Sequence, residues 1–480
     1  MNNRMVFFTV GQIIKLEAAL LLLPALVSLL YKEDCLWAVL VAVAVALVIG
    51  FALTLLSRPK NQMIFAKEGF VIVALAWLSL SAIGALPFFL SREIPSYVDA
   101  LFETISGFTT TGASILTDVE SMSRGLLFWR SFTHWIGGMG VLVLMMAILP
   151  GSGGRAMHIM RAEVPGPTVG KLVPRLRDTA KILYIIYLGL TVIEVLFLLC
   201  GGMPLFDSLL HAFGTAGTGG FGIKADGLAS YSPYLQWVIT VFMLLFGVNF
   251  NLYYLILIRH FKTAFTNREL WVYGGVVLAS ITAIVCNTVS LYDRFGDAVR
   301  HASFQVAAIV TTTGFATTDF NLWPGFSKAI LFLLMFMGGC AGSTAGGLKV
   351  SRIMLFFKTI ARDLRRMLHP RSMGAVTMEG KRVDDAVVQG VSSYFVLFFV
   401  LFAACFLIVS VEPFSFETNL TAVASCLNNI GPGLGEVGPM GSFAGYSALS
   451  KVTLSLAMLF GRLEIYPLLL TLIPSTWTKE

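Results

Sequence analysis

The chain has 480 residues, of which 56% are hydrophobic and 13% charged, and its net charge is +7. Soluble domains carry about 25% charged residues, so this composition excludes an ordinary soluble protein and predicts an integral membrane protein with many spans. Cytoplasmic loops rich in lysine and arginine explain the positive charge better than nucleic-acid binding does. The six scattered cysteines indicate neither a metal site nor a disulfide framework.

Two long apolar segments come first, Val6–Tyr31 and Leu36–Leu56, each near the roughly 20 residues that span a bilayer. Arg4 and the apolar run after it resemble the start of a signal peptide, but no clear cleavage site follows. We therefore expect a retained helix. This pair, residues 1–60, is predicted to be an extra unit ahead of the rest.

The remaining chain is predicted to be four copies of one unit. Each copy has a long apolar segment, a short apolar segment, a pentapeptide centred on glycine and a second long segment. The glycines recur about a hundred residues apart, which is typical of an internal repeat. The expected units are residues 61–155, 156–265, 266–375 and 376–480, and their pentapeptides are residues 110–114, 218–222, 312–316 and 429–433.

The short segments are too short to cross a membrane. At about 1.5 Å per residue they reach roughly halfway, which predicts re-entrant half-helices whose negative C-terminal ends face a pore. They are Val98–Phe108, Leu205–Phe213, Ala298–Ile309 and Thr418–Leu427, and the long segments that follow the pentapeptides are Leu126–Leu149, Leu235–Ile258, Ala329–Phe357 and Tyr446–Leu470. The predicted fold is an all-α integral membrane protein, with two N-terminal helices and four pseudo-symmetric helix–pore loop–helix repeats around one pore per protomer.

The pentapeptides have the composition of a cation filter. A cation that crosses a bilayer needs oxygens in place of water, and loop carbonyls can supply them where glycine permits the required backbone. Turn glycines between helices are the alternative for any single loop. The predicted filter comprises Thr110, Thr111, Gly112, Thr218, Gly219, Gly220, Thr312, Thr313, Gly314, Asn429, Ile430 and Gly431, with K+ at Thr111, Gly219, Thr313 and Ile430.

The third unit's second long segment is interrupted by a glycine-rich run, residues 338–347. Each glycine costs a helix about 1 kcal/mol relative to alanine, so we expect an intramembrane loop below the filter that obstructs ion passage. Its candidate gate residues are Gly338, Gly339, Gly342, Ser343, Thr344, Gly346 and Gly347. A small-residue packing face is the alternative.

Arg462 belongs to the same prediction. An arginine inside the membrane needs a polar partner, so we expect it to repel cations below the filter and to contact the carbonyls of the glycine-rich run. Snorkelling to the inner surface is the alternative. Glu464 is expected to serve a different neighbour, because residues two apart on a helix do not share a face.

Charge predicts the orientation. Lysines and arginines concentrate between the repeats, in residues 155–181, 259–268 and 352–382, whereas the filter-side segments lean acidic. The N-terminus and the inter-repeat loops are therefore expected in the cytoplasm, with the filters opening outward. His369-Pro370-Arg371 lies in a basic loop and suits either a regulatory subunit or anionic lipid.

Residues 106–113, 215–221 and 311–315 resemble the Trk/Ktr/HKT superfamily of potassium transporters over essentially the whole chain, and the two extra helices resemble its TrkH branch. The resemblance implies a homodimer in the bacterial inner membrane with one pore per protomer. It implies a cytosolic TrkA-like subunit that carries the nucleotide, ATP/ADP or NAD, and no cofactor on this chain. It also implies that the glycine-rich loop gates, that Arg462 belongs to the barrier, and that Gly112, where plant-type sodium carriers have serine, favours potassium.

Three functions compete at this point. The first is a gated, channel-like potassium uptake protein, and the second is a symporter that couples K+ to H+ or Na+. The third, an intramembrane enzyme, lacks a catalytic constellation, and no phosphate-binding motif indicates ATP hydrolysis by this chain.

Overall fold

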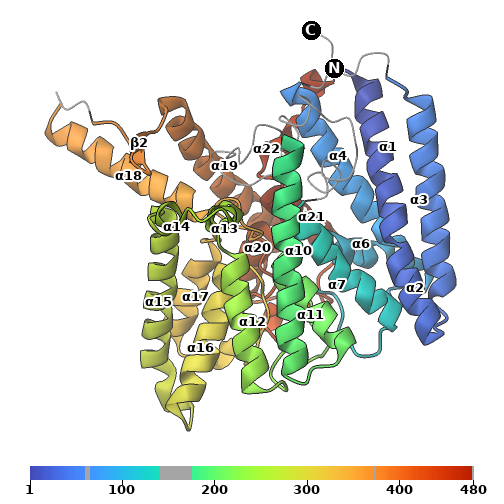
Figure 1. Cartoon of the computed structure of the whole chain (residues 1–480), viewed down its shortest axis with the longest axis horizontal. Coiled ribbons are helices and arrows are strands. Elements are labelled where there is room, and N and C mark those ends of the chain that lie inside the picture. The colour runs from blue at the N-terminus through green and yellow to red at the C-terminus, as the bar shows by residue number, and fades with distance from the viewer. Residues whose placement is uncertain (60–64, 141–175, 371–373, 478–480) are drawn as a thin grey trace.

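A computed structural model describes residues 1–59, 65–140, 176–370 and 374–477. Three helices form a flank at the N-terminus: α1 (Asn3–Leu20), α2 (Leu22–Tyr31) and α3 (Leu36–Leu56). Figure 1 shows them in blue at one side of the molecule. α1 packs between α3 and α4, so these three N-terminal helices are attached to the first repeat and stand outside the central bundle.

Four repeats make up the rest of the described chain, and each contributes a membrane helix, a half-helix and a second helix. The first helices are α4 (Ala66–Gly84, continued by α5, Leu86–Leu90), α10 (Leu176–Cys200), α15 (Arg268–Thr288) and α19 (Asp385–Val409). The half-helices are α6 (Tyr97–Phe108), α11 (Leu205–Gly217), α16 (Phe295–Val310) and α20 (Phe416–Asn428). The second helices begin with α7 (Arg124–Gly138), α12 (Pro233–Phe246), α17 (Gly325–Met335) and α21 (Ala448–Arg462). The predicted fold is therefore confirmed.

Local sequence explains where the half-helices start. Each has an acidic residue in its first turn, where the positive end of the helix dipole favours a carboxylate: Asp99, Asp207, Asp297 and Glu417. Serines cap two of them, because Ser96 accepts from the Asp99 N–H and Ser415 from the Thr418 N–H.

The second helices differ from the prediction, which had continuous spans over Leu235–Ile258 and Tyr446–Leu470. α12 ends at Phe246, and α13 (Phe250–Leu257) continues at 91°. α21 ends at Arg462, and α22 (Tyr466–Leu472) follows after two residues with positive φ, Glu464 and Ile465. Tertiary contacts cause the first break, since the freed carbonyls of Phe246 and Gly247 accept bonds from Thr344 and Cys340 of the glycine-rich loop.

In the third repeat the break is wider. The chain leaves helical geometry after α17 and resumes it at α18 (Val350–Leu368), so residues 338–347 are a loop as their glycines predicted. α18 runs out from the bundle on the side of both chain termini (Figure 1). The predicted residues 141–149 of the first repeat's second span lie outside the described residues.

Small elements complete the described chain. They are α14 (Phe261–Phe265), the 3-10 turns η1 (Val289–Leu291), η2 (Phe320–Leu322), η3 (Gly435–Val437) and η4 (Pro474–Thr476), and one antiparallel strand pair, β1 (Thr377–Met378) with β2 (Lys381–Arg382). The expected unit boundaries near residues 60 and 155 lie outside the described residues. Residue 265 is the last residue of α14, and residue 375 falls between α18 and β1.

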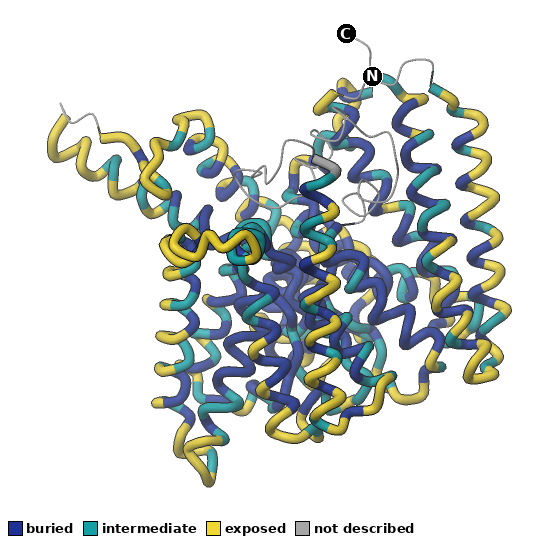
Figure 2. Tube along the Cα trace, in the orientation of Figure 1, coloured by how far each residue is buried: buried dark blue, intermediate teal, exposed yellow. Residues whose placement is uncertain are grey.

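Burial follows the architecture of a membrane protein. Among the described residues, six helices are long and apolar enough to cross a bilayer, or seven if the bent pair α12–α13 is one span. Large apolar side chains are exposed on α3, such as Val48 and Leu56, where a soluble protein would be polar. Figure 2 shows the buried tube concentrated at the centre, where the half-helices converge.

Candidate functional site

The four pentapeptides adopt one backbone conformation. The first residue of each pentapeptide has a left-handed backbone conformation, with φ of 53° at Thr110, 55° at Thr218, 55° at Thr312 and 56° at Asn429. The glycine two residues later also has positive φ: 79° at Gly112, 76° at Gly220, 78° at Gly314 and 106° at Gly431. The residue between them donates its N–H to the half-helix end in every repeat, by the bonds Thr111–Ser106, Gly219–Gly214, Thr313–Ala308 and Ile430–Ser425, at 2.8–3.0 Å.

These loops meet edge to edge in a closed ring. A Cβ added to Gly112 would lie 1.9 Å from the carbonyl oxygen of Gly219. A Cβ added to Gly220 would lie 1.8 Å from Thr313 O, one added to Gly314 would lie 1.9 Å from Ile430 O, and one added to Gly431 would lie 2.8 Å from Thr111 O. Each glycine thus faces the carbonyl of the residue that precedes the glycine of the next repeat. The glycine of the fourth repeat faces the first repeat in the same way, which closes the ring. The contacts leave no room for a side chain at the first three glycines.

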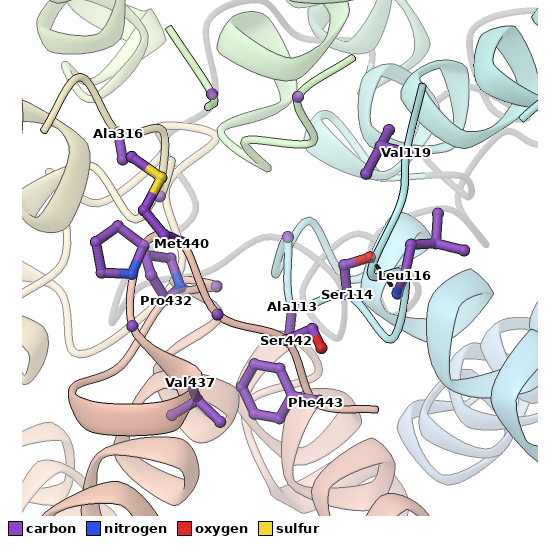
Figure 3. A pocket seen from close by; sticks show the side chains of 18 of the residues that line it. Ala113, Ser114, Leu116, Val119, Ala316, Pro432, Val437, Met440, Ser442 and Phe443 are labelled. Atoms are coloured by element: carbon purple, nitrogen blue, oxygen red, sulfur yellow. Dashed lines mark hydrogen bonds between the residues drawn. The ribbon is translucent and has the colours of Figure 1, made fainter. Parts of the chain in front are cut away.

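The ring forms the floor of an open cavity of about 510 Å³. All four filter glycines line it, and Figure 3 shows Ala113 and Ser114 of the first repeat facing Pro432, Met440 and Phe443 of the fourth. The last two belong to a segment that crosses to the first repeat, where Phe443 N–H donates to Ser114 O at 2.8 Å. This cavity is a vestibule on the side of the half-helix N-termini.

The first residue of each pentapeptide lies at the turn beneath the ring, and in the second, third and fourth repeats its side chain makes a further hydrogen bond. Thr218 Oγ1 donates to Thr344 O at 3.0 Å, and Thr312 Oγ1 accepts from the Gly346 N–H at 2.6 Å. Asn429 Nδ2 donates to Thr111 Oγ1 at 3.0 Å. A β-branched residue with positive φ is strained. At Thr218 and Thr312 the surrounding structure holds this strained backbone, and in that conformation the hydroxyl contacts the glycine-rich loop.

The glycine-rich loop is packed under the ring through its backbone. A Cβ at Gly338 would lie 2.1 Å from Gly346 O, one at Gly339 2.8 Å from Gly247 O, and one at Gly346 2.8 Å from Asn428 O. Gly342 and Gly347 have φ of 72° and 64°. Ser343 Oγ closes a turn onto Cys340 O at 2.7 Å. Glycine is therefore required at these positions by close approach or by conformation.

Arg462 lies against this loop. Its guanidinium donates to Thr344 O at 2.9 Å, to Gly137 O at 2.6 Å and to Gly138 O at 2.8 Å, and the residue is only 7% exposed. Glu464 contacts another partner, as its spacing predicted, and forms an ion pair with Arg352 of α18. The arginine thus joins the loop to α7, which follows the first filter.

Lys349 and Glu269 also hold the loop, and the sequence did not lead us to either. Lys349 is 1% exposed, and its ammonium donates to Ala345 O and Gly346 O. Together, the side chains of Lys349 and Arg462 donate hydrogen bonds to three successive loop carbonyls, those of residues 344, 345 and 346. Glu269 Oε1 accepts from the N–H of Ala341 at 2.7 Å and of Ser351 at 3.1 Å. A lysine two residues after the glycine-rich run was the available signal for Lys349. Nothing in the local sequence marked Glu269.

Some predicted features cannot be placed. The basic residues expected at 155–175 and Arg371 lie outside the described residues. Lys358, Arg362, Arg365 and Arg366 lie on α18, which extends on the side of the termini.

Comparison with known proteins gives consistent matches. The chain matches the TrkH family, described as a cation transport protein, over residues 37–274 and 268–479. It is 37% identical to the Trk system potassium uptake protein TrkH of Salmonella typhimurium and 36% identical to that of Escherichia coli K12, each alignment covering 100% of both chains. The crystal structure of the potassium transporter TrkH from Vibrio parahaemolyticus superimposes with a TM-score of 0.90 at 34% identity, over 100% of both chains.

Proposed function

Because the chain belongs to the TrkH family of cation transport proteins, we propose that it takes up potassium across the bacterial cytoplasmic membrane through the ring of pore-loop carbonyls. It is a multi-pass membrane protein and a transport protein, not an enzyme. The relatives are named as potassium uptake proteins, which supports K+ as the transported ion.

The main support for this proposal is that the four pore loops contact one another in a closed ring. The carbonyls of Thr111, Gly219, Thr313 and Ile430 stand at matched positions, each against the glycine of the preceding repeat. Their N–H groups are tied to the half-helix ends, so the backbone is fixed before an ion arrives. Preorganised carbonyls replace the hydration shell of a cation, and four converging helix C-termini add negative potential.

The glycine-rich loop is proposed as the gate below this filter. Thr218, Thr312 and Asn429, at the base of the filter, touch it directly. Lys349 and Arg462 donate to the loop carbonyls that would otherwise face the ion path. The guanidinium of Arg462 is also a fixed positive charge under the ring, which opposes the passage of a cation by repulsion. Opening then requires these donors to leave the loop.

A regulatory partner is proposed to control that loop. The relatives' designation as parts of a Trk system supports a TrkA-like cytosolic subunit, which would carry the nucleotide. The membrane chain itself is proposed to form a homodimer. α18 directly follows the loop and bears Lys358, Arg362 and Arg365 on the side of the termini. By the positive-inside rule that side is cytoplasmic, so a partner bound there would pull on the loop through α18.

Serine in place of Gly112 tests the filter. The Cβ of the added side chain would lie 1.9 Å from Gly219 O, so the first loop must shift and the ring must widen or tilt. We expect the K+:Na+ flux ratio in proteoliposomes to fall on the order of tenfold, equivalent to about 1.4 kcal/mol of discrimination. An unchanged cation preference would contradict the filter assignment.

A symporter remains the second candidate, and one observation favours it. Glu17 on α1 is 1% exposed, and neither of its carboxylate oxygens has a hydrogen-bond partner among the described residues; Glu194 on α10 is also fully buried. An intramembrane acid is a candidate proton site. Proton movement during potassium uptake decides between the two mechanisms. Uptake without coupled proton flux is expected for the channel-like mechanism, whereas a fixed H+:K+ ratio lost in Glu17→Gln or Glu194→Gln would establish the symporter.

A further inference from the structure

A buried ion pair lies behind the filter, in a place that the gate and the ring do not use. Glu103 on α6 and Arg130 on α7 are 1% and 3% exposed, and Arg130 Nε lies 2.6 Å from Glu103 Oε1. Charges removed from water are costly unless their remaining hydrogen-bonding capacity is satisfied. The other contacts of the pair therefore indicate what it holds in place.

Those contacts go to the segments directly after two filter glycines. Glu103 accepts from Ser114 Oγ at 2.9 Å and from the Ile115 N–H at 3.0 Å, just beyond Gly112. Arg130 donates to Gly222 O at 2.9 Å, just beyond Gly220. Its guanidinium also lies 3.6 Å from the ring centre of Phe221. One ion pair thus connects the first and second pore loops.

The third and fourth loops also have contacts within their own repeats. Leu434, at the position matching Ile115, donates its N–H to Thr421 Oγ1 of α20 at 2.8 Å. Thr317, at the matching position of the third loop, pairs through Oγ1 with His301 Nδ1 of α16 at 2.9 Å. The second loop differs, because its Gly222 is held by a side chain from the first repeat. Other neighbouring loops are linked by uncharged groups, because Leu228 donates its N–H to Ala316 O at 2.8 Å and Gly435 donates its N–H to Asn321 Oδ1 at 2.9 Å. The Glu103–Arg130 ion pair is the corresponding link between the first and second loops.

We propose that Glu103 and Arg130 are positioning residues of the filter, which set the spacing between the Gly112 and Gly220 loops and so help to fix the preference for potassium over sodium. The proposal rests on the filter function given above. Gly112 faces Gly219 O, so a shift of the segment after either glycine changes the separation of neighbouring ring carbonyls. Glu103 also neutralises Arg130, which lines the vestibule, so that the guanidinium does not repel incoming cations.

The test is the double variant Glu103→Leu/Arg130→Met of the full chain, purified and reconstituted in liposomes. Replacing both members of a buried ion pair with apolar residues is often neutral for stability, so the thermal unfolding midpoint is expected to stay near that of the wild type. The K+:Na+ flux ratio is expected to fall at least about fivefold, which corresponds to the loss of one hydrogen bond. A folded double variant with the wild-type ratio overturns the proposal.

If the double variant does not fold, the Arg130→Lys variant tests the positioning role instead. One ammonium keeps the charge but cannot reproduce the fork that reaches both Glu103 and Gly222, so the ratio should again fall, and a wild-type ratio contradicts the proposal. The control Arg382→Gln/Asp385→Asn removes the exposed 3.7 Å ion pair at the start of α19 and should leave the ratio unchanged. If Gly112→Ser alters the ratio while the Glu103 and Arg130 variants do not, only the positioning role fails. If Gly112→Ser also has no effect, the filter itself fails.

Discussion

Alanine in place of Gly220 is expected to abolish potassium-selective uptake. The new Cβ would lie 1.8 Å from Thr313 O, and the residue would keep a left-handed φ of 76°, which L-residues adopt at a cost of roughly 1–2 kcal/mol. The ring must open at this contact, so a carbonyl is lost from the ion's shell. A displacement of about 1 Å at a reacting centre costs enzymes on the order of 100-fold in rate, and we expect a similar loss of potassium flux.

Substitutions at two further glycines provide comparisons for this result. Gly189 lies on α10 where an added Cβ meets nothing within 4 Å in the described structure, so Gly189→Ala should leave flux unchanged. Gly431 has its nearest neighbour, Thr111 O, at 2.8 Å, so Gly431→Ala should be the mildest of the four filter substitutions. Wild-type transport by Gly220→Ala would contradict the ring, as would greater damage from Gly431→Ala than from Gly220→Ala.

Methionine in place of Arg462 is expected to raise the basal potassium leak. The guanidinium donates to Thr344 of the loop and to Gly137 and Gly138 of α7, and methionine keeps much of the volume without any donor. A hydrogen bond from a charged group contributes about 1.5–3 kcal/mol, so loss of the Thr344 contact alone should favour loop release at least about tenfold. Because the ring carbonyls themselves are untouched, the leak should still carry potassium.

The measurement is flux through the purified chain without its regulatory partner, compared with Lys328→Met. Lys328 is a cation near the start of α17, at the opposite end of that helix from the loop, and lies 3.6 Å from Glu417. Its variant should behave as the wild type. A leak in Arg462→Met no greater than in the control would count against the loop as the gate.

The sequence was sufficient for features that local chemistry determines. The half-helices have apolar runs with acidic first turns, and the glycines at matched positions predicted one conformation for all four loops, which the backbone angles share. The glycine-rich run likewise predicted the break after α17. In each case the cause lies within a few residues of the effect.

Features that depend on distant contacts were not predictable. Residues 235–258 were predicted as one span, yet the helix breaks after Phe246. Gly247 and the α13 cap Asn249 stand at the break, and a loop about a hundred residues later bonds to the freed carbonyls. Glu269 and the Glu103–Arg130 pair acquire their roles only when separate helices are packed together. Arg130 has no distinguishing neighbour in the sequence, and only its bond to Gly222 identifies it.

Thr218 and Thr312 connect ion selection with gating. The sequence suggested them as filter residues, and their hydroxyls bond to Thr344 and Gly346 of the loop. A displacement of the loop therefore alters the support beneath two ring carbonyls. Filter and gate are in direct contact, so we expect the selectivity of the open state to depend on the gate conformation.

Anomalous scattering from crystals grown in rubidium would test the carbonyl ring most directly, since Rb+ substitutes for K+ and can be located without ambiguity. We predict a peak on the ring axis, coordinated by the carbonyls of Thr111, Gly219, Thr313 and Ile430, and its loss in Gly220→Ala. Rubidium bound elsewhere in the wild-type protein, with no peak at the ring, would contradict the filter.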